Sequence, residues 1–359
     1  MKAAVCRAFG APLSIEEVAL AAPKAGEVRV KVSACAICHS DISYMRGEWG
    51  GELPAVYGHE AAGVVAEVGP KVAGIKSGDH VVVTLVRHCG HCGYCADGLQ
   101  VQCEEVFPLD RASPLQDADG SALHQEMRTG AFAEEVTVHA SQVVAVPQDL
   151  PLDRAALLAC GVVTGYGAVA NAADLRPGST AVVIGAGGVG LNSIQTIALR
   201  EAALNIALDT SDAKLEAAKA FGASHGVNPA KEDAAARVLE LTGGRGVDYV
   251  FVTVGAKPAF DQAPAMLARG GALVLVGMPP EGVRCEYEPT AFAARNQRIL
   301  GTKMGSTRIQ VDIPYLAELY RSGRFKLDEL ITGRYALDQV NEAVAAAERG
   351  EALRNVIVF

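Results

Sequence analysis

Short apolar runs alternate with helical patterns after about residue 155 of the chain. The run over 180–184 is rich in β-branched residues, which is typical of a strand buried on both faces. A glycine turn, a helix to about Arg200 and a second strand over 205–209 follow it. Similar patterns continue as a helix (211–221), a strand near 227, a helix (233–241), a strand (247–254), a helix (259–268) and strands at 272–276 and 297–301. Strands that alternate with helices in this way predict a doubly wound parallel sheet, and therefore an α/β fold class.

The first 150 residues show a different pattern, in which short β-branched runs are separated by glycine and proline. The runs over 27–32, 61–68 and 80–85 predict strands of a compact, barrel-like β domain. Residues 104–129 are polar with little periodicity, so a long surface loop is expected there. The tail predicts helices at about 314–322 and 338–349 and a strand over 355–359. That strand has no obvious partner in the α/β region, so we expect it to return to the first domain.

Length and charge narrow the class of protein. The chain has 359 residues, half of them apolar, which favours two domains, each with its own core. A net charge of −9, with both signs interspersed, argues against a nucleic-acid surface, which would need a basic stripe. The first residues lack the apolar run of a signal peptide, and glycines interrupt the most apolar window, 181–199, so no membrane span is expected. We therefore expect a cytoplasmic protein, whose nine cysteines are metal ligands or core residues rather than disulfides.

Four cysteines lie in one short segment, with spacings that suit a metal. They are Cys89, Cys92, Cys95 and Cys103. Four thiolates can surround Zn²⁺ tetrahedrally, which is typical of a structural zinc site without an open position for substrate. An iron–sulfur module is the alternative, but the last gap is seven residues and no proline follows Cys103.

A glycine pattern, Gly185-Ala186-Gly187-Gly188-Val189-Gly190, follows the first predicted strand of the α/β region and opens a helix. In this context glycines allow the backbone to approach a pyrophosphate at the helix N-terminus. Asp209 ends the next strand, where a carboxylate accepts hydrogen bonds from an adenosine ribose and repels a 2′-phosphate. No arginine follows it at residues 210 and 211. The sequence therefore predicts a dinucleotide site that prefers NAD to NADP.

Three more potential ligands are scattered along the chain. Cys38 lies before His39-Ser40-Asp41, His59 lies between Gly58 and Glu60, and Cys160 precedes the α/β region. Two thiolates and one imidazole leave a fourth zinc position open, which is the pattern of a catalytic site. Spacing alone does not join these residues, because each could equally be a core side chain.

The whole chain resembles the zinc-dependent medium-chain alcohol dehydrogenases. The motifs that carry the resemblance are Cys38-His39-Ser40-Asp41, Gly58-His59-Glu60, the four-cysteine run, Cys160-Gly-x-x-Thr164-Gly-Tyr-Gly, the glycine pattern with Asp209, and Arg354. The resemblance implies a Rossmann domain over 162–303. It also implies a β-rich, GroES-like catalytic domain over 1–161 and 304–359, with a structural zinc lobe at about 88–104.

By this resemblance the chain binds two Zn²⁺ ions and NAD, and interconverts a primary alcohol and an aldehyde. Cys38, His59 and Cys160 would bind the catalytic zinc, which lowers the pKa of an alcohol oxygen before hydride transfer to the nicotinamide. Asp41 would fix the His59 tautomer, Glu60 would lie behind the metal, and Ser40 would take the alcohol proton. Ser43 stands where well-known members have the histidine that ends the proton relay, so water or His39 would complete the relay here.

The resemblance also assigns contacts with the cofactor and the substrate. Besides the glycine pattern and Asp209, the expected cofactor contacts are His39, Thr164, Lys214, Val254, Val276 and Arg354. We expect Thr164 to pack against the nicotinamide, and His39 and Arg354 to meet the pyrophosphate. The expected substrate pocket contains Trp49, Leu85, Phe132 and Met278, which favours an aliphatic or aromatic primary alcohol. Phe132 could instead be a core aromatic residue.

Several alternatives stay open at this point. The same fold could serve a thiol-adduct formaldehyde dehydrogenase or a polyol dehydrogenase. A chain that binds NAD as a scaffold, with structural zinc only, is the alternative that is not an enzyme. The expected partners are a small alcohol or aldehyde and further copies of the chain, as a homodimer or a homotetramer, with neither nucleic acid nor membrane.

Overall fold

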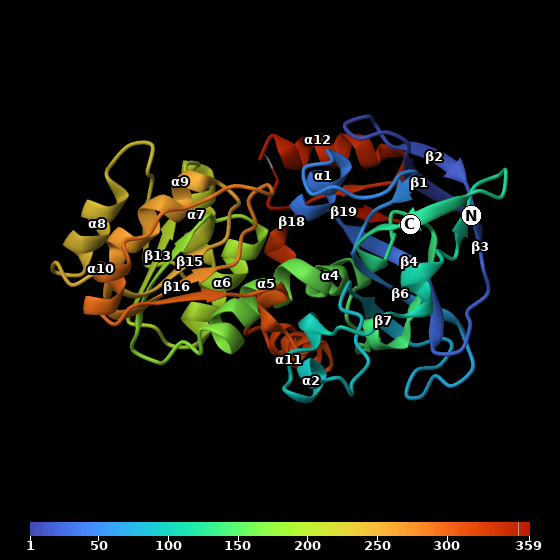
Figure 1. Ribbon diagram of the computed structural model, residues 1–359, viewed down its shortest axis with the longest axis horizontal. Helices are drawn as coiled ribbons and strands as arrows, with labels where there is room; N and C mark the ends of the chain where they lie inside the picture. The colour runs from blue at the N-terminus through green and yellow to red at the C-terminus, as the bar shows by residue number, and fades with distance from the viewer. Residues whose placement is uncertain (351) are drawn as a thin grey trace. The chain divides into compact units, whose positions relative to one another are not determined.

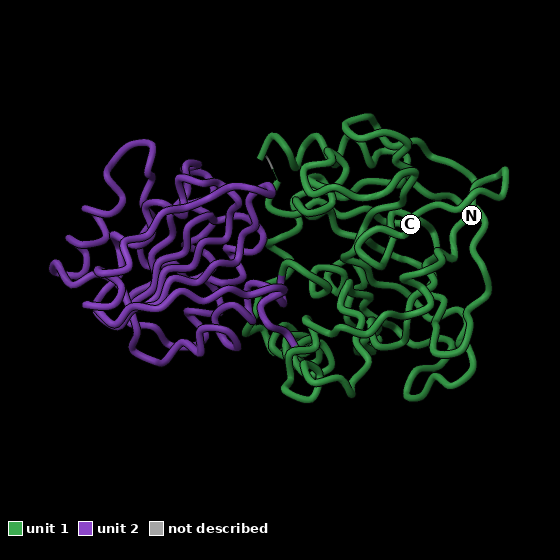
Figure 2. Tube along the Cα trace, viewed as in Figure 1, with its two compact units in different colours: residues 1–161, 308–359 green, residues 162–307 purple. Residues whose placement is uncertain are grey.

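The computed structural model describes residues 1–350 and 352–359, which form two compact units. Unit 1 comprises Met1–Gly161 and Arg308–Phe359, and unit 2 comprises Val162–Thr307 (Figure 2). Residues 304–307, which the sequence analysis assigned to the catalytic domain, belong to unit 2. The reason is local packing: Thr164 Oγ1 donates a hydrogen bond to Met304 Sδ at 3.7 Å, and a Cβ on Gly167 would lie 2.1 Å from the Gly305 oxygen.

Unit 1 is built around two sheets (Figure 1). The larger sheet has the strand order β11-β7-β6-β4-β19-β18, with β10 also paired to β4. Its strands are β4 (Glu27–Ala36), β6 (Glu60–Val68), β7 (His80–Val83), β10 (Glu135–His139), β11 (Val143–Ala145), β18 (Ile331–Tyr335) and β19 (Arg354–Val358). The other sheet joins β1 (Lys2–Cys6), β2 (Ser14–Glu17), β3 (Ala19–Leu20), β5 (Ala55–Val56), β8 (Leu115–Gln116) and β9 (Ala122–Gln125). The helices of unit 1 are α1 (His39–Met45), α2 (Gly93–Ala96), α3 (Pro108–Arg111), α4 (Leu152–Leu157), α11 (Ile309–Arg321) and α12 (Val340–Glu348).

The expected return of the tail is confirmed by β19, which pairs antiparallel with β4, so that Val356 lies opposite Ala36. The prediction of a long surface loop over 104–129 is wrong. This segment contributes α3, β8 and β9, and its Leu115 and Leu123 are fully buried in the core. Strands of two to four residues are too short to show an alternating pattern, so the polar residues around the two leucines dominated the sequence signal.

Unit 2 contains a six-stranded sheet in the order β14-β13-β12-β15-β16-β17, with every pair parallel (Figure 1). The strands are β12 (Thr180–Ile184), β13 (Leu204–Leu208), β14 (His225–Val227), β15 (Val247–Val252), β16 (Leu267–Leu275) and β17 (Arg298–Gly301). The helices are α5 (Val163–Gly167), α6 (Gly188–Leu199), α7 (Asp212–Ala220), α8 (Ala234–Leu241), α9 (Lys257–Gln262) and α10 (Pro289–Ala294). Counted along the chain this order is 3-2-1-4-5-6, the arrangement in which dinucleotides bind beyond the carboxyl ends of the central strands. The predicted doubly wound α/β fold is confirmed.

One helical stretch, Leu152–Ala172, is apolar and long enough to cross a membrane by length and composition alone. Most of it, 83 % of its most apolar window, is buried within the protein. Such burial is typical of a core helix.

Candidate functional site

The two strands at the centre of the larger unit 1 sheet bring distant residues together. Strands β4 and β6 are antiparallel, and Ala36 at the end of β4 lies opposite Glu60 at the start of β6. Cys38 follows β4 as the cap of α1, and His59 precedes β6, so the sheet places both at one edge. Cys160 comes from a π-helical turn, Leu158–Val162, that follows α4.

Cys38, His59, Glu60 and Cys160 form one buried group, whose potential ligand atoms all lie within 4.8 Å of one another. Nε2 of His59 is buried and has no hydrogen-bond partner among the described residues. An imidazole nitrogen left without a partner beside two thiols is a position that a metal ion satisfies. The donor set of two thiolates and one imidazole therefore fits Zn²⁺ and leaves a position for a substrate oxygen.

Asp41 holds two members of this group in place. Its Oδ2 accepts a hydrogen bond from the Cys38 N–H at 3.0 Å, and its Oδ1 accepts one from the Gly58 N–H at 3.0 Å. Oδ1 also lies 3.0 Å from Nδ1 of His59, so Nδ1 carries the proton and Nε2 is left for a metal. This is the contact that the resemblance implied for Asp41.

The surroundings also adjust the protonation of the group. A hydrogen bond from the Cys160 thiol lowers the pKa of Cys38 well below the ordinary range of a thiol. A hydrogen bond and the charge of His59 lower it further. Burial opposes the charged form of His59, but the Asp41 carboxylate and Cys38 raise its pKa well above the usual value. Since the thiolate is the form of cysteine that binds metal, Cys38 is prepared as a ligand.

Glu60 and Arg354 form a buried ion pair beside the group. Burial raises the pKa of Glu60 to about 7, against the opposing charge of Arg354. The structure thus pairs Arg354 with Glu60, because a carboxylate with no exposed surface requires a counter-charge, and the pyrophosphate contact expected by resemblance stays a prediction. Gly161 makes room for this pair, since a Cβ there would lie 2.9 Å from Arg354 Nη1. This pair was not predicted from the sequence, and the glycine directly after Cys160 is the one local signal of the close packing.

The four-cysteine run closes into a second cluster. The sulfur atoms of Cys89, Cys92, Cys95 and Cys103 lie within 4.8 Å of one another. The Cys89–Cys95 and Cys92–Cys103 separations are 3.9 Å. These distances are too long for disulfides, and none of the nine cysteines forms a disulfide. A tetrahedron with Zn–S bonds of about 2.3 Å has edges of about 3.8 Å, so the four sulfurs fit Zn²⁺. Backbone N–H groups of Cys95 and Glu104 lower the pKa of Cys92 to about 6, which favours a thiolate.

In unit 2 the glycine turn lies between β12 and α6, as expected. A Cβ on Gly190 would lie 1.7 Å from the Gly185 oxygen, so this close turn requires glycine. A Cβ on Gly187 would meet nothing within 4 Å, which leaves the backbone at the start of α6 open to a ligand. Asp209 Oδ2 accepts a hydrogen bond from the Ala186 N–H at 2.8 Å, so the carboxylate lies against the turn. Free amides at a helix N-terminus, beside an accessible glycine backbone, fit a dinucleotide pyrophosphate.

Comparison with known proteins agrees with both halves of this architecture. Residues 24–148 match the family "Alcohol dehydrogenase GroES-like domain", and residues 188–321 match "Zinc-binding dehydrogenase". The NDMA-dependent alcohol dehydrogenase of Amycolatopsis methanolica is 38 % identical, over 99 % of this chain and 98 % of its own. The chain belongs to the zinc-dependent medium-chain alcohol dehydrogenases.

Two further members of the family show its range. The S-(hydroxymethyl)glutathione dehydrogenase of Paracoccus denitrificans is 33 % identical, over 100 % of this chain and 99 % of its own. The crystal structure of benzyl alcohol dehydrogenase from Acinetobacter calcoaceticus has a TM-score of 0.93 and 31 % identity, and covers 100 % of this chain and 99 % of its own. The fold is therefore a Rossmann domain joined to a GroES-like domain, and the protein is an oxidoreductase of the alcohol dehydrogenase class.

The remaining expected contacts of the dehydrogenase are divided between the two units. In unit 1, His39 is exposed at the start of α1, and Ser40 and Ser43 follow it on that helix, half-buried. In unit 2, Val254 packs at Gly185 of the turn, Val276 is buried, and Lys214 lies in the first turn of α7. Thr164 is buried and bonded to Met304.

The four residues expected to line the substrate pocket of the dehydrogenase differ in how deeply they are buried. Phe132 is fully buried in the core of unit 1, so the alternative of a core aromatic residue is the observed one. Its N–H donates to the Tyr57 oxygen at 2.8 Å, which fixes the residue in that core. Trp49 and Leu85 are half-buried, and Trp49 meets Tyr44 edge-on at 5.3 Å between ring centroids. Met278 belongs to unit 2 and is 62 % exposed.

We expect Asp41→Asn to weaken zinc binding at the Cys38–His59–Cys160 group by about 10- to 100-fold, because an amide cannot accept all three hydrogen bonds. Chelator competition against the purified dehydrogenase measures this affinity. Asp312→Asn, which changes a buried carboxylate that caps α11, is the matched control and should leave zinc affinity unchanged. Equal zinc affinity in Asp41→Asn and the unaltered protein would contradict the role of Asp41.

Proposed function

We propose that the dehydrogenase oxidises a primary alcohol, aliphatic or aromatic, to an aldehyde, and catalyses the reverse reduction, with two Zn²⁺ ions and NAD. The observation that carries the proposal is the buried His59 Nε2, which lies beside the thiols of Cys38 and Cys160 and has no hydrogen-bond partner within residues 1–350 and 352–359. This arrangement favours an active enzyme over a scaffold that carries structural zinc alone. A scaffold has no use for a donor set with an open position.

The residues of unit 1 have separate roles in the proposed reaction. Cys38, His59 and Cys160 would hold the catalytic Zn²⁺, which supplies a Lewis acid for the alcohol oxygen when bound. Asp41 keeps the proton on His59 Nδ1 through their 3.0 Å contact. Ser40 takes up the alcohol proton. Cys89, Cys92, Cys95 and Cys103 would hold the second, structural Zn²⁺ away from this chemistry.

The residues of unit 2 bind the hydride acceptor. The glycine turn and the start of α6 receive the pyrophosphate, and Asp209 receives the adenosine ribose. A nicotinamide held by these residues would supply the acceptor for the hydride of the alcohol carbon. The name of the Amycolatopsis methanolica relative shows that a member of the family can depend on NDMA, so the acceptor of this chain is tested directly below.

A substrate panel tests the proposed function. The zinc-loaded protein is assayed with aliphatic and aromatic primary alcohols, a polyol, and the adduct of formaldehyde and glutathione, each with NAD, NADP or NDMA as acceptor. We expect the highest kcat/KM for a primary alcohol, because Trp49 and Leu85 are apolar. We expect NAD to be the preferred acceptor, because the Asp209 carboxylate repels a 2′-phosphate. A preference for the glutathione adduct, the activity named for the Paracoccus denitrificans relative, would replace the proposed substrate.

We expect Asp209→Asn to reduce the preference for NAD over NADP by about tenfold, because it removes the charge that repels a 2′-phosphate. Asparagine keeps an acceptor for the Ala186 N–H of the glycine turn and gives up only the acceptor for the Ser211 N–H. Binding of each dinucleotide is measured by calorimetry. Asp233→Asn, which changes the carboxylate that caps α8, is the control and should bind both as the unaltered protein does. An unchanged preference in Asp209→Asn would show that this carboxylate does not distinguish NAD from NADP at the adenosine ribose.

A further inference from the structure

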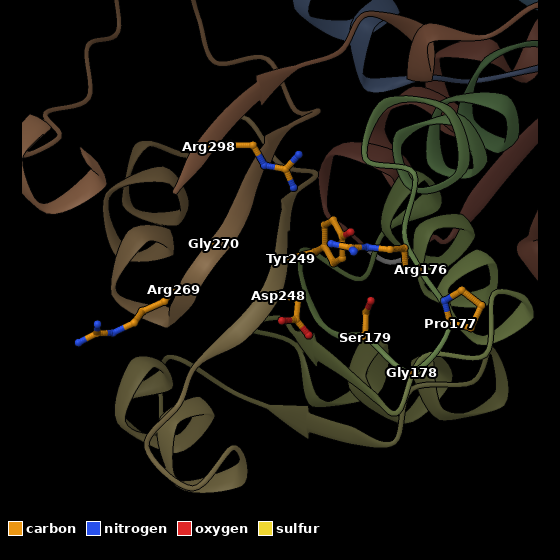
Figure 3. Close-up of a pocket in the computed structure, with 9 residues that line it drawn as sticks. All are labelled: Arg176, Pro177, Gly178, Ser179, Asp248, Tyr249, Arg269, Gly270 and Arg298. Atoms are coloured by element: carbon orange, nitrogen blue, oxygen red, sulfur yellow. The ribbon is translucent and has the colours of Figure 1, made fainter. Parts of the chain in front are cut away.

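Unit 2 contains a second pocket, of about 360 Å³, at the amino ends of its strands (Figure 3). Its lining includes Ser179 just before β12, Tyr249 in β15, and the arginines Arg176, Arg269 and Arg298. The glycine turn follows the carboxyl end of β12, so the pocket and the dinucleotide site lie at opposite ends of that strand.

The three arginines of this pocket have no side-chain acceptor in the part of the chain that the structure describes. Among the described residues, no side-chain hydrogen bond or ion pair involves Arg176, Arg269 or Arg298, and all three are exposed. Many other arginines of this acidic chain have carboxylate partners, as Arg321 has Asp149 and Glu318. Guanidinium groups that gather around a hollow without a carboxylate partner leave a local positive charge.

The one carboxylate of the pocket does not neutralise that charge. Asp248 Oδ2 accepts hydrogen bonds from the N–H and the hydroxyl of Thr180, both at 2.9 Å. Asp248 Oδ1 is paired with Arg245, which is not among the pocket residues. Both carboxylate oxygens are therefore engaged by other groups, and the three arginines are left to an external anion.

Two of the arginines converge. Figure 3 shows Arg176 and Arg298 pointing toward Tyr249 from opposite sides, whereas Arg269 points away from them. Tyr249 is 3 % exposed and forms a fixed floor, stacked on Phe251 at 6.1 Å. The hydroxyl of Ser179, which also lines the pocket, adds a hydrogen-bond donor.

We propose that this pocket binds a dianionic phosphate group, as the free ion or as a small phosphate monoester, between Arg176 and Arg298. Guanidinium groups donate paired hydrogen bonds to phosphate oxygens, and two of them match the two charges of a phosphate at neutral pH. The volume exceeds that of a phosphate ion and leaves room for a small ester group over Tyr249. Such a site is separate from the reaction and from the pyrophosphate contacts of NAD.

The test titrates inorganic phosphate and, separately, glycerol 3-phosphate into the zinc-loaded protein at constant ionic strength. NAD is present at saturation, so that the glycine turn is occupied. Calorimetry should show one saturable site that chloride does not fill. We expect Arg176→Gln and Arg298→Gln each to weaken binding about tenfold, since each removes a charged hydrogen-bond donor. Tighter binding of glycerol 3-phosphate than of phosphate identifies a phosphate monoester as the ligand, and the reverse identifies the free ion.

Two matched controls distinguish specific binding in the pocket from nonspecific attraction of phosphate to positive charge. Arg269→Gln removes the pocket arginine that points away, and Arg324→Gln removes an exposed arginine of unit 1. Both should bind phosphate within about twofold of the unaltered protein. The proposal is overturned if saturable binding is absent, or if all four variants weaken binding equally. Alcohol oxidation should stay unchanged in Arg176→Gln and Arg298→Gln, because neither residue belongs to the reaction.

Discussion

Cys38→Ser should lose one of two zinc ions per chain and reduce alcohol oxidation by at least about a thousandfold. Serine keeps the size of the side chain but not the thiolate, whose pKa in Cys38 is already lowered by the neighbouring Cys160 and His59. The remaining Cys160 and His59 offer only two protein ligands, too few for a stable zinc site. Elemental analysis of the dialysed protein and the initial rate with a primary alcohol give the two readouts.

Cys35→Ser is the matched control for this prediction. Cys35 is also buried and lies three residues before Cys38, in β4, but it is not part of the metal-binding group. We expect this variant to keep both zinc ions and most of its activity, with some loss of stability. Full activity in Cys38→Ser, or equal zinc loss in both variants, would refute the assignment of the catalytic ligands.

Cys92→Ser should also lose one zinc ion, but this loss should reduce stability and leave the activity nearly unchanged. Binding of a structural zinc contributes directly to the free energy of folding, so the lobe at 88–104 loses its order. We expect the Tm to fall by about 5 °C or more, and proteases to cut within the lobe. The activity per catalytic zinc should stay close to that of the unaltered protein, because the second cluster has no open position for substrate.

The comparison for this variant is Cys285→Ser, which changes a half-buried cysteine of unit 2 outside both clusters. It should keep two zinc ions and an unchanged protease pattern. If Cys92→Ser instead lost both zinc ions and all activity at the temperature of the assay, the division into a structural and a catalytic site would be wrong.

Unit 2 was predicted well from the sequence because its strands are buried on both faces. The run over Thr180–Ile184 is almost wholly apolar, and the strand has the predicted bounds. Unit 1 was predicted less completely. Its strands β8 and β9 have two and four residues, and only Leu115 and Leu123 show that this segment belongs to the core. Periodicity needs more residues than such strands provide.

The site divides in a similar way. The four-cysteine run and the glycine turn are local, so their spacing predicted both. Cys38, His59 and Cys160 come together only through the pairing of β4 with β6 and the turn after α4. A family resemblance was needed to connect them. The pairing of Glu60 with Arg354 depends on a strand almost three hundred residues away, and neither local pattern nor resemblance indicated it.

The place of Arg354 in the chain affects how the protein folds during synthesis. Strand β19 is made after all of unit 2, although it pairs with β4 beside the first metal ligand. While the ribosome is still producing unit 2, every cysteine and histidine of both clusters already exists, but Glu60 has no counter-charge. Burying that carboxylate alone is costly, which favours full closure of unit 1 only after Arg354 has emerged. Unit 2, which is continuous in the chain, is free to fold first.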